Sequence, residues 1–131
     1  MLIIEKCKIE KVIEHCRKSY PEECCGVLVG SKDETVAVKM VFEGKNLNSE
    51  TPKDRYELDP LDFIKAEQEA KKENLEVVGF YHSHPNHPAL PSDFDRIRAW
   101  PCYSYLILSV LEDGQTVGRS WVLNENKDRF E

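Results

Sequence analysis

The first half of the chain shows blocks of apolar residues whose spacing predicts strands and helices in turn. A short strand is predicted over residues 2–5, and a helix over residues 8–19, where apolar side chains recur at helical spacing. Pro21 ends this helix. The apolar run Cys24–Val29, closed by Gly30, predicts a buried strand, and the alternating, β-branched run Thr35–Phe42 predicts another.

A polar segment rich in turn-forming residues, 44–55, predicts a loop in the middle of the chain. A short strand is expected at Arg55–Leu58. Asp59-Pro60 then predicts a helix start, with Asp59 as the cap and the proline at the first helical position. That helix is expected to run to about Asn74, and its buried stripe is Phe63, Ala66 and Ala70.

The second half continues the same alternation. A strand rich in β-branched and aromatic residues is predicted over 75–84, and Ser92 is expected to cap a short helix that ends near Ala99. Two further strands, Tyr103–Leu111 and Thr116–Leu123, flank a turn at 112–114. The chain carries no linker or internal repeat, so we expect one α/β domain over residues 1–131, with a mixed β-sheet flanked by helices.

Composition and charge restrict the possible partners. The 131 residues are 40% hydrophobic and 32% charged, which is the balance of an ordinary globular domain. A net charge of -6 argues against nucleic acid or an anionic membrane as a partner bound by bulk charge. No apolar run approaches the roughly 18 residues needed to span a bilayer, and the N-terminus lacks the pattern of a signal peptide, so a cytoplasmic location is expected.

The five cysteines do not form a recognisable framework. An odd number in a chain without an export signal argues against structural disulfides, and no C-x-x-C pair occurs. Cys24 and Cys25 are adjacent, which disfavours their joining one tetrahedral zinc site. The cysteines are therefore expected to be small buried hydrophobes, and the roles of Cys24 and Cys25 stay open.

The residues that carry chemistry are concentrated in the segment GFYHSHPNHPALPSDFDRIRAW. His82 and His84 are two positions apart on a predicted strand, so both imidazoles should point to the same face. A proline-rich loop follows, and Asp95 lies in the first turn of the next helix, where its carboxylate could supply a third ligand. Three protein ligands leave a fourth position for water, as in catalytic zinc sites.

Other interpretations account for parts of this segment. Ser92-x-x-Asp95 also fits a capping box, in which the serine and the carboxylate satisfy backbone N–H groups without any metal. An isolated H-x-H pair is by itself a weak zinc signal. His87 lies among prolines and is expected to face solvent or substrate rather than a metal.

Taken together, the spacings resemble those of the JAMM (MPN-plus) metalloproteases. His82-x-His84-Pro85, followed by Ser92-x-x-Asp95, matches the H-x-H-x(7)-S-x-x-D pattern of that family. The family's P-x-E-x-C-G context matches residues 21–26 and places its glutamate on Glu23. The phrases DRYELDP and WPCYSYLILSV extend the resemblance over nearly the whole chain. They are most similar to the short prokaryotic members that process ubiquitin-like sulfur carriers.

The resemblance implies a fold and a role for each residue. The family fold is a cytidine-deaminase-like α/β architecture. His82, His84 and Asp95 would hold Zn²⁺, Glu23 would act as the general acid/base, and Ser92 would donate a hydrogen bond to the oxyanion. The substrate would be the C-terminal Gly-Gly tail of a ubiquitin-like sulfur-carrier protein, added as a strand at a sheet edge. Residues 45–55 and 86–91 are candidate contacts.

Three rival interpretations are weighed against this one. A zinc deaminase needs H-x-E and P-C-x-x-C, whereas this chain has His84 in place of the glutamate and Tyr-Ser-Tyr after Cys102. A non-catalytic MPN-type scaffold would be expected to lack the metal residues, which are all present. A zinc hydrolase of other peptides or small amides remains an alternative.

The sequence leaves open whether a peptide or an isopeptide bond is cleaved. It also leaves the oligomeric state open, with a homodimer among the options.

Overall fold

The structure is a computed structural model that describes residues 2–48, 56–123 and 130–131. Strands and helices alternate in these segments, as the apolar blocks of the sequence predict. In chain order the elements are β1 (Leu2–Ile4), α1 (Lys6–Ser19), β2 (Cys25–Lys32), β3 (Val36–Glu43), α2 (Pro60–Lys72), β4 (Glu76–Pro85), α3 (Asp93–Arg98), β5 (Ser104–Val110) and β6 (Thr116–Val122).

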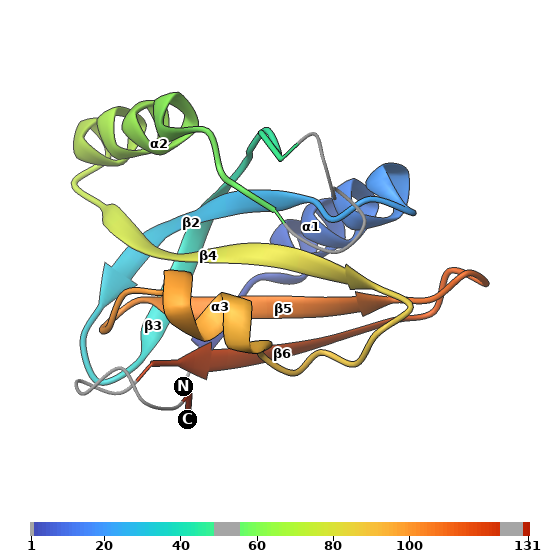
Figure 1. Cartoon of the computed structure of the whole chain (residues 1–131). Coiled ribbons are helices and arrows are strands. Elements are labelled where there is room, and N and C mark those ends of the chain that lie inside the picture. Colours follow the sequence, from blue (N-terminus) through green and yellow to red (C-terminus); the bar gives the residue numbers. More distant parts are fainter. Residues whose placement is uncertain (1, 49–55, 124–129) are drawn as a thin grey trace.

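The strands form one mixed sheet in the order β1-β3-β2-β4-β5-β6 (Figure 1). β1 pairs with β3 and β4 pairs with β5 in parallel, while the other neighbours are antiparallel. β2 and β4 therefore lie in the interior of the sheet, and β1 and β6 are its edges. This confirms the predicted α/β class with a mixed sheet flanked by helices.

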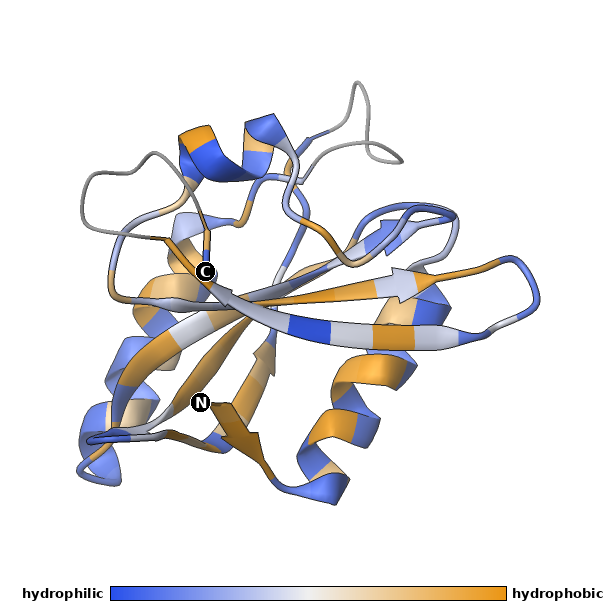
Figure 2. Cartoon of the chain, turned by 90° about the horizontal axis from the view of Figure 1, so that it is seen from below, coloured by the Kyte–Doolittle hydropathy of each residue, from blue (hydrophilic) through white to orange (hydrophobic). Residues whose placement is uncertain are grey.

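Two hydrophobic cores lie on opposite faces of the sheet because successive strand residues point in opposite directions. On one face, Val12 and Cys16 of α1 pack with Leu28 and Tyr81. On the other face, Ala66 and Ala70 of α2 pack with Val27 and Phe80, and Phe63 is packed against the same cluster, as predicted. Figure 2 shows that apolar residues dominate the central strands, whereas apolar and polar residues alternate along α1.

Side-chain caps fix where α2 begins. The Asp59 carboxylate accepts a hydrogen bond from the Leu61 backbone N–H at 2.9 Å, and Pro60 occupies the first helical position. The helix ends at Lys72, two residues earlier than predicted. Asn74 has a φ of 57°, and a residue in this left-handed region cannot continue a right-handed helix.

Two other expectations about strands were wrong. β2 does not end before Gly30 but continues to Lys32, pairing with Val36–Val38 of β3. Gly30 is needed there because a Cβ would collide with the carbonyl oxygen of Ala37. The predicted strand at 55–58 is also absent: Arg55 lies outside the described residues, and Leu58 makes only an isolated bridge with Asn46.

None of the helices in the described segments is both long enough and apolar enough to cross a membrane.

Candidate metal centre

The centre is built on the C-terminal half of β4. His82 and His84 point to the α2 side of the sheet with Phe80, while Tyr81 packs into the core on the α1 side. β4 is an interior strand, with Cys25 of β2 opposite His82 on one side and Ile107 of β5 on the other. Both imidazoles are consequently buried, with 1% and 8% of their surfaces exposed. The period of a strand thus brings the two rings together, as predicted.

Asp95 reaches the same point from α3. Its Oδ2 atom lies 3.1 Å from Nε2 of His84 and 3.3 Å from Nε2 of His82, and the two Nε2 atoms are 3.2 Å apart. Three potential ligand atoms from two elements therefore converge on one buried point. The structure brings together all three residues that the sequence suggested as ligands.

The capping box predicted as an alternative is also present, and it holds Asp95 in place. The Ser92 hydroxyl accepts from the Asp95 backbone N–H at 3.0 Å, and Asp95 Oδ2 accepts from the Ser92 backbone N–H at 2.9 Å. The same carboxylate oxygen thus faces both histidines and the helix N-terminus. The capping box and the contacts with the two histidines are therefore compatible, because one carboxylate makes both.

The loop after β4 fixes the tautomer of His84. Its Nδ1 lies 2.9 Å from the backbone carbonyl oxygen of Pro88, which can only accept a hydrogen bond. Nδ1 must therefore carry a proton. When the ring is charged, Nε2 also carries a proton and donates it to Asp95; when the ring is neutral, the lone pair of Nε2 is available to a metal. Outer hydrogen bonds of this kind orient histidine ligands in metal sites.

His82 is oriented differently. Its Nδ1 is buried and has no hydrogen-bond partner among the described residues. Instead, the ring stacks on Tyr56, with a centroid distance of 4.4 Å and an interplanar angle of 24°. Tyr56 was not singled out in the sequence, because nothing in the spacing of a loop residue 26 positions earlier indicates this contact.

The charge states of the three groups follow from burial and mutual contact. Burial lowers the pKa of His82, and Asp95 offsets this only in part. At His84 burial also acts to lower the pKa, but the hydrogen bonds to Asp95 and Pro88 prevail and raise it. Burial alone would raise the pKa of Asp95, yet hydrogen bonds from both histidines hold it well below its usual range. Asp95 is therefore ionised at neutral pH, the state that a metal requires of a carboxylate.

Glu23 approaches the histidines from the segment just before β2. It is only 6% exposed, and one of its carboxylate oxygens and one nitrogen from each histidine all lie within 4.8 Å of one another. The backbone around it is held on both sides: Asn46 donates to the Glu23 carbonyl oxygen at 3.1 Å, and the Cys24 N–H donates to Ser83 Oγ at 2.9 Å. Two carboxylates thus flank the histidine pair, and Asp95 makes the tighter contact with both rings.

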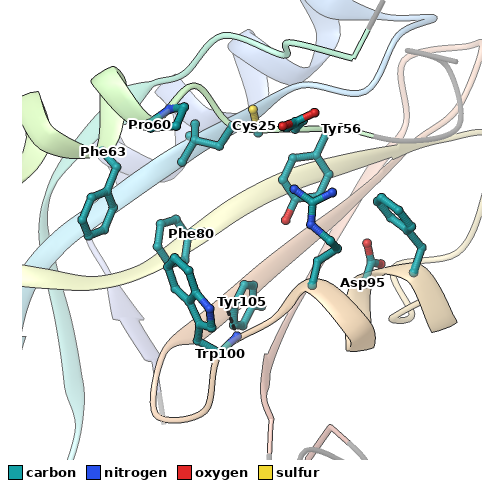
Figure 3. A pocket seen from close by; sticks show the side chains of 13 residues that line it. Cys25, Tyr56, Pro60, Phe63, Phe80, Asp95, Trp100 and Tyr105 are labelled. Carbon is teal, nitrogen blue, oxygen red and sulfur yellow. Dashed lines mark hydrogen bonds between the residues drawn. The ribbon is translucent and has the colours of Figure 1, made fainter. Parts of the chain in front are cut away.

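Two cavities adjoin the centre. One, which we call the reaction chamber, has a volume of about 350 Å³ and is lined by Glu23, His84, His87, Pro88, Leu90 and Ser92. The other, which we call the aromatic recess, has a volume of about 300 Å³ and includes Tyr56, Phe80 and Asp95 in its wall (Figure 3). His87 is therefore at the chamber wall, where its expected role of facing substrate or solvent can be met.

The cysteines are not part of the ligand set. Cys16, Cys24 and Cys25 are buried, as expected, and Cys16 Sγ lies 3.4 Å from Cys24 Sγ. The expectation was wrong for Cys7 and Cys102, which are exposed. Cys7 lies on a surface position of α1, and Cys102 has a φ of 75° in the turn before β5.

The chain is similar to known proteins over nearly its full length. Residues 8–124 match a family described as prokaryotic homologs of the JAB domain. Desampylase from Haloferax volcanii is 36% identical over 124 residues, covering 91% of this chain and 86% of that protein. Desampylase from Pyrococcus furiosus is 38% identical over 105 residues, covering 79% and 68%. The probable TtuB-protein conjugate cleaving protease from Thermus thermophilus is 32% identical over 95 residues, covering 72% and 61%.

A solved structure supports the same conclusion. The solution structure of protein DSY2949 from Desulfitobacterium hafniense has a TM-score of 0.85 and 30% sequence identity, and the match covers 100% of this chain and 90% of that one. Both the fold and the sequence therefore agree with the resemblance drawn from the motifs. The chain belongs to the prokaryotic homologs of the JAB domain, and it is a JAMM-type peptidase that hydrolyses peptide or isopeptide bonds.

Proposed function

We propose that this chain is a zinc-dependent enzyme that hydrolyses the amide bond after the C-terminal Gly-Gly of a ubiquitin-like sulfur-carrier protein. The observation that carries the proposal is the convergence of His82 Nε2, His84 Nε2 and Asp95 Oδ2 within 3.3 Å of one another, beside the buried Glu23. Two imidazoles and one carboxylate form a common ligand set for catalytic zinc.

The side chains fit zinc in three respects. The ligand atoms are two nitrogens and one oxygen, Pro88 leaves the Nε2 lone pair of His84 available, and Asp95 is ionised. When bound, zinc lowers the pKa of a water to about 7 and polarises the scissile carbonyl. His82, His84 and Asp95 are the residues that would hold it.

Glu23 is proposed as the general acid/base. Its carboxylate lies beside the histidines and lines the reaction chamber, so it can accept a proton from the attacking water. It would then deliver that proton to the leaving nitrogen as the amide bond breaks. A residue in this role has to be near the ligands without being one of them, and Asp95 is the carboxylate that contacts both imidazoles directly.

Ser92 is proposed to stabilise the oxyanion. Its hydroxyl oxygen accepts a hydrogen bond from Asp95, which leaves the hydroxyl hydrogen available to donate. The side chain lines the reaction chamber with Glu23 and His84. One donor at the developing negative charge is typically worth about 100- to 1000-fold in rate.

The substrate assignment draws on the relatives named for conjugate cleavage and on the shape of the site. The centre is buried at an interior strand, so only a narrow segment can reach it, and glycines permit such an approach. Strand addition at a sheet edge, which the sequence suggested, does not fit, because the edges β1 and β6 carry none of the site residues. The tail would instead enter across the loops. Of the two predicted contact segments, residues 87, 88 and 90 line the chamber, and residues 49–55 lie outside the described structure.

An intact-mass assay tests the proposal. The zinc-loaded protein is incubated with a ubiquitin-like sulfur carrier that is extended by a few residues past its Gly-Gly. We expect removal of only those residues, and we expect a chelator or the variant Glu23→Gln to prevent it. An unchanged mass, with zinc shown to be bound, would reject this substrate and favour the alternative of other peptides or small amides. Purification without stoichiometric zinc would favour a non-catalytic scaffold.

A further inference from the structure

The aromatic recess has no part in the chemistry assigned so far. Phe80 forms its floor and is surrounded by Phe63, Trp100 and Tyr105, at centroid distances of 6.0, 6.2 and 5.7 Å (Figure 3). Its volume of about 300 Å³ is ample for one large side chain, and Arg98 also lines it. An apolar cavity with a few polar groups at its wall is the usual form of a small binding pocket.

The recess shares a wall with the metal centre. Asp95 and Tyr56 both line it, and Tyr56 is the residue that stacks on His82. Glu23 and Ser92 line the reaction chamber instead. A group bound in the recess would therefore lie beside the ligands but apart from the proposed acid/base and oxyanion donor.

The strand geometry gives the distance between the metal centre and the aromatic recess. Phe80 and His82 are two positions apart on the same face of β4, which separates them by about 6.6 Å along the strand. Two extended residues of a bound peptide span the same distance. If the scissile carbonyl lies at the metal centre, a Gly-Gly pair reaches back past Tyr56, and the preceding residue arrives over Phe80.

We propose that the aromatic recess is the specificity pocket for the residue immediately before the Gly-Gly, and that it selects a large apolar side chain. This inference rests on the proposed function. The four aromatic rings favour an apolar occupant. The wall carries one cation, Arg98, and two carboxylates, Glu57 and Asp95, so the selection rests on the rings and not on charge. The recess would thus distinguish among carriers that share the same Gly-Gly ending.

The test uses the zinc-loaded full chain and peptides of the form acetyl-Ala-X-Gly-Gly-aminomethylcoumarin, with X as Leu, Phe, Ala or Arg. We expect kcat/KM for Leu and Phe to exceed that for Ala by about tenfold or more, since hydrophobic pockets discriminate by this amount for small differences in side chain. The Arg peptide should also be cleaved more slowly than the Leu and Phe peptides, because burying its guanidinium among aromatic rings costs desolvation. The same order should appear in the dissociation constants of the free products that end in X-Gly-Gly, measured by titration calorimetry, which needs no turnover.

A chain variant links the preference to the recess. Trp100 is 54% exposed at the rim, and its hydrogen bond to Tyr105 uses the backbone N–H, so Trp100→Ala should fold normally. It should reduce the Leu-to-Ala ratio several-fold. Val117→Ala is the matched control, since Val117 is an apolar side chain 58% exposed on the edge strand β6, and it should leave the ratio unchanged.

The outcomes separate the recess from the proposed function. Cleavage of all four peptides at similar rates would overturn the recess as a specificity pocket and leave the proposed function standing. A preference that survives Trp100→Ala unchanged would also overturn it. If no peptide is cleaved with zinc bound, equal dissociation constants for the X-Gly-Gly products would overturn the recess, and an unchanged mass of the extended carrier would overturn the proposed function.

Discussion

Ser92 joins the helix cap to the proposed chemistry, and replacing it should separate the two. The hydroxyl accepts the Asp95 N–H at 3.0 Å, and in the proposed mechanism it also donates to the oxyanion. Ser92→Ala removes both interactions. Loss of an N-cap costs about 1 kcal/mol, whereas loss of an oxyanion donor typically lowers kcat by about 100- to 1000-fold.

The stability effect alone cannot account for a rate loss of this size. Domains are usually stable by about 5–15 kcal/mol, so a loss of about 1 kcal/mol leaves nearly every molecule folded. For a chain of 131 residues it should lower the melting temperature by roughly 3–5 °C. Any fall in kcat measured well below the melting temperature would therefore report on chemistry rather than on unfolding.

Two further substitutions at the same position act as controls. Ser92→Gly also removes the hydroxyl, but glycine is a tolerable N-cap and costs only a few tenths of a kcal/mol. Ser92→Thr keeps a hydroxyl that can both cap and donate. We measure the melting temperature, the bound zinc and the peptidase kcat of all three variants. The alanine and glycine variants should lose similar activity despite different stabilities, and the threonine variant should retain most of it.

The oxyanion role would be refuted by a zinc-loaded Ser92→Gly protein whose kcat stays within a few-fold of the parent. If the alanine variant also lost its zinc, the principal role of Ser92 would be to position Asp95 through the capping box. In that case Ser92 would act in assembling the ligand set and not in the reaction itself.

Three other substitutions test the centre. Glu23→Gln should bind zinc with near-normal affinity and lose turnover, and measurable peptidase activity in it would remove Glu23 from the mechanism. His84→Ala should retain little zinc after dialysis, measured by atomic absorption, because two remaining ligands hold the metal poorly; tight stoichiometric zinc would show the ligand assignment to be wrong. Tyr56→Ala should weaken zinc binding by about 10- to 100-fold in competition with a chromogenic chelator, the usual cost of losing an orienting contact, whereas Tyr56→Phe keeps the ring and should not.

The parts of the site that the sequence predicted are those set by short-range geometry. The two-residue spacing of His82 and His84 is sufficient to place them on one face of a strand. Ser92 and Asp95 are three residues apart at a helix start, where a capping box is a local arrangement. The same is true of the Asp59 cap and of the stripe of apolar residues along α2. Each depends on the conformation of a few consecutive residues.

The parts that the sequence did not predict depend on the packing of distant segments. Tyr56 comes from a loop without periodic signal, and only the finished fold lays its ring on His82. The contact between Pro88 and His84 depends on the path of a proline-rich loop. The sequence predicts a strand end at Gly30 because glycine often ends a strand, whereas the close approach of β3 requires a glycine inside β2.

The different restraints on the two carboxylates support the proposal that one site holds a ligand and a base of the same chemical type. Asp95 is held by three contacts at one oxygen: Oδ2 faces both imidazoles and accepts a hydrogen bond from the Ser92 N–H at the start of the same helix. A ligand benefits from such rigidity because a preorganised site binds metal without paying further ordering entropy. Glu23 comes from another element and lines the reaction chamber, where a proton has to be received at one position and delivered at another. The proposed division of roles therefore follows from which carboxylate the fold holds against the histidines and which lines the reaction chamber.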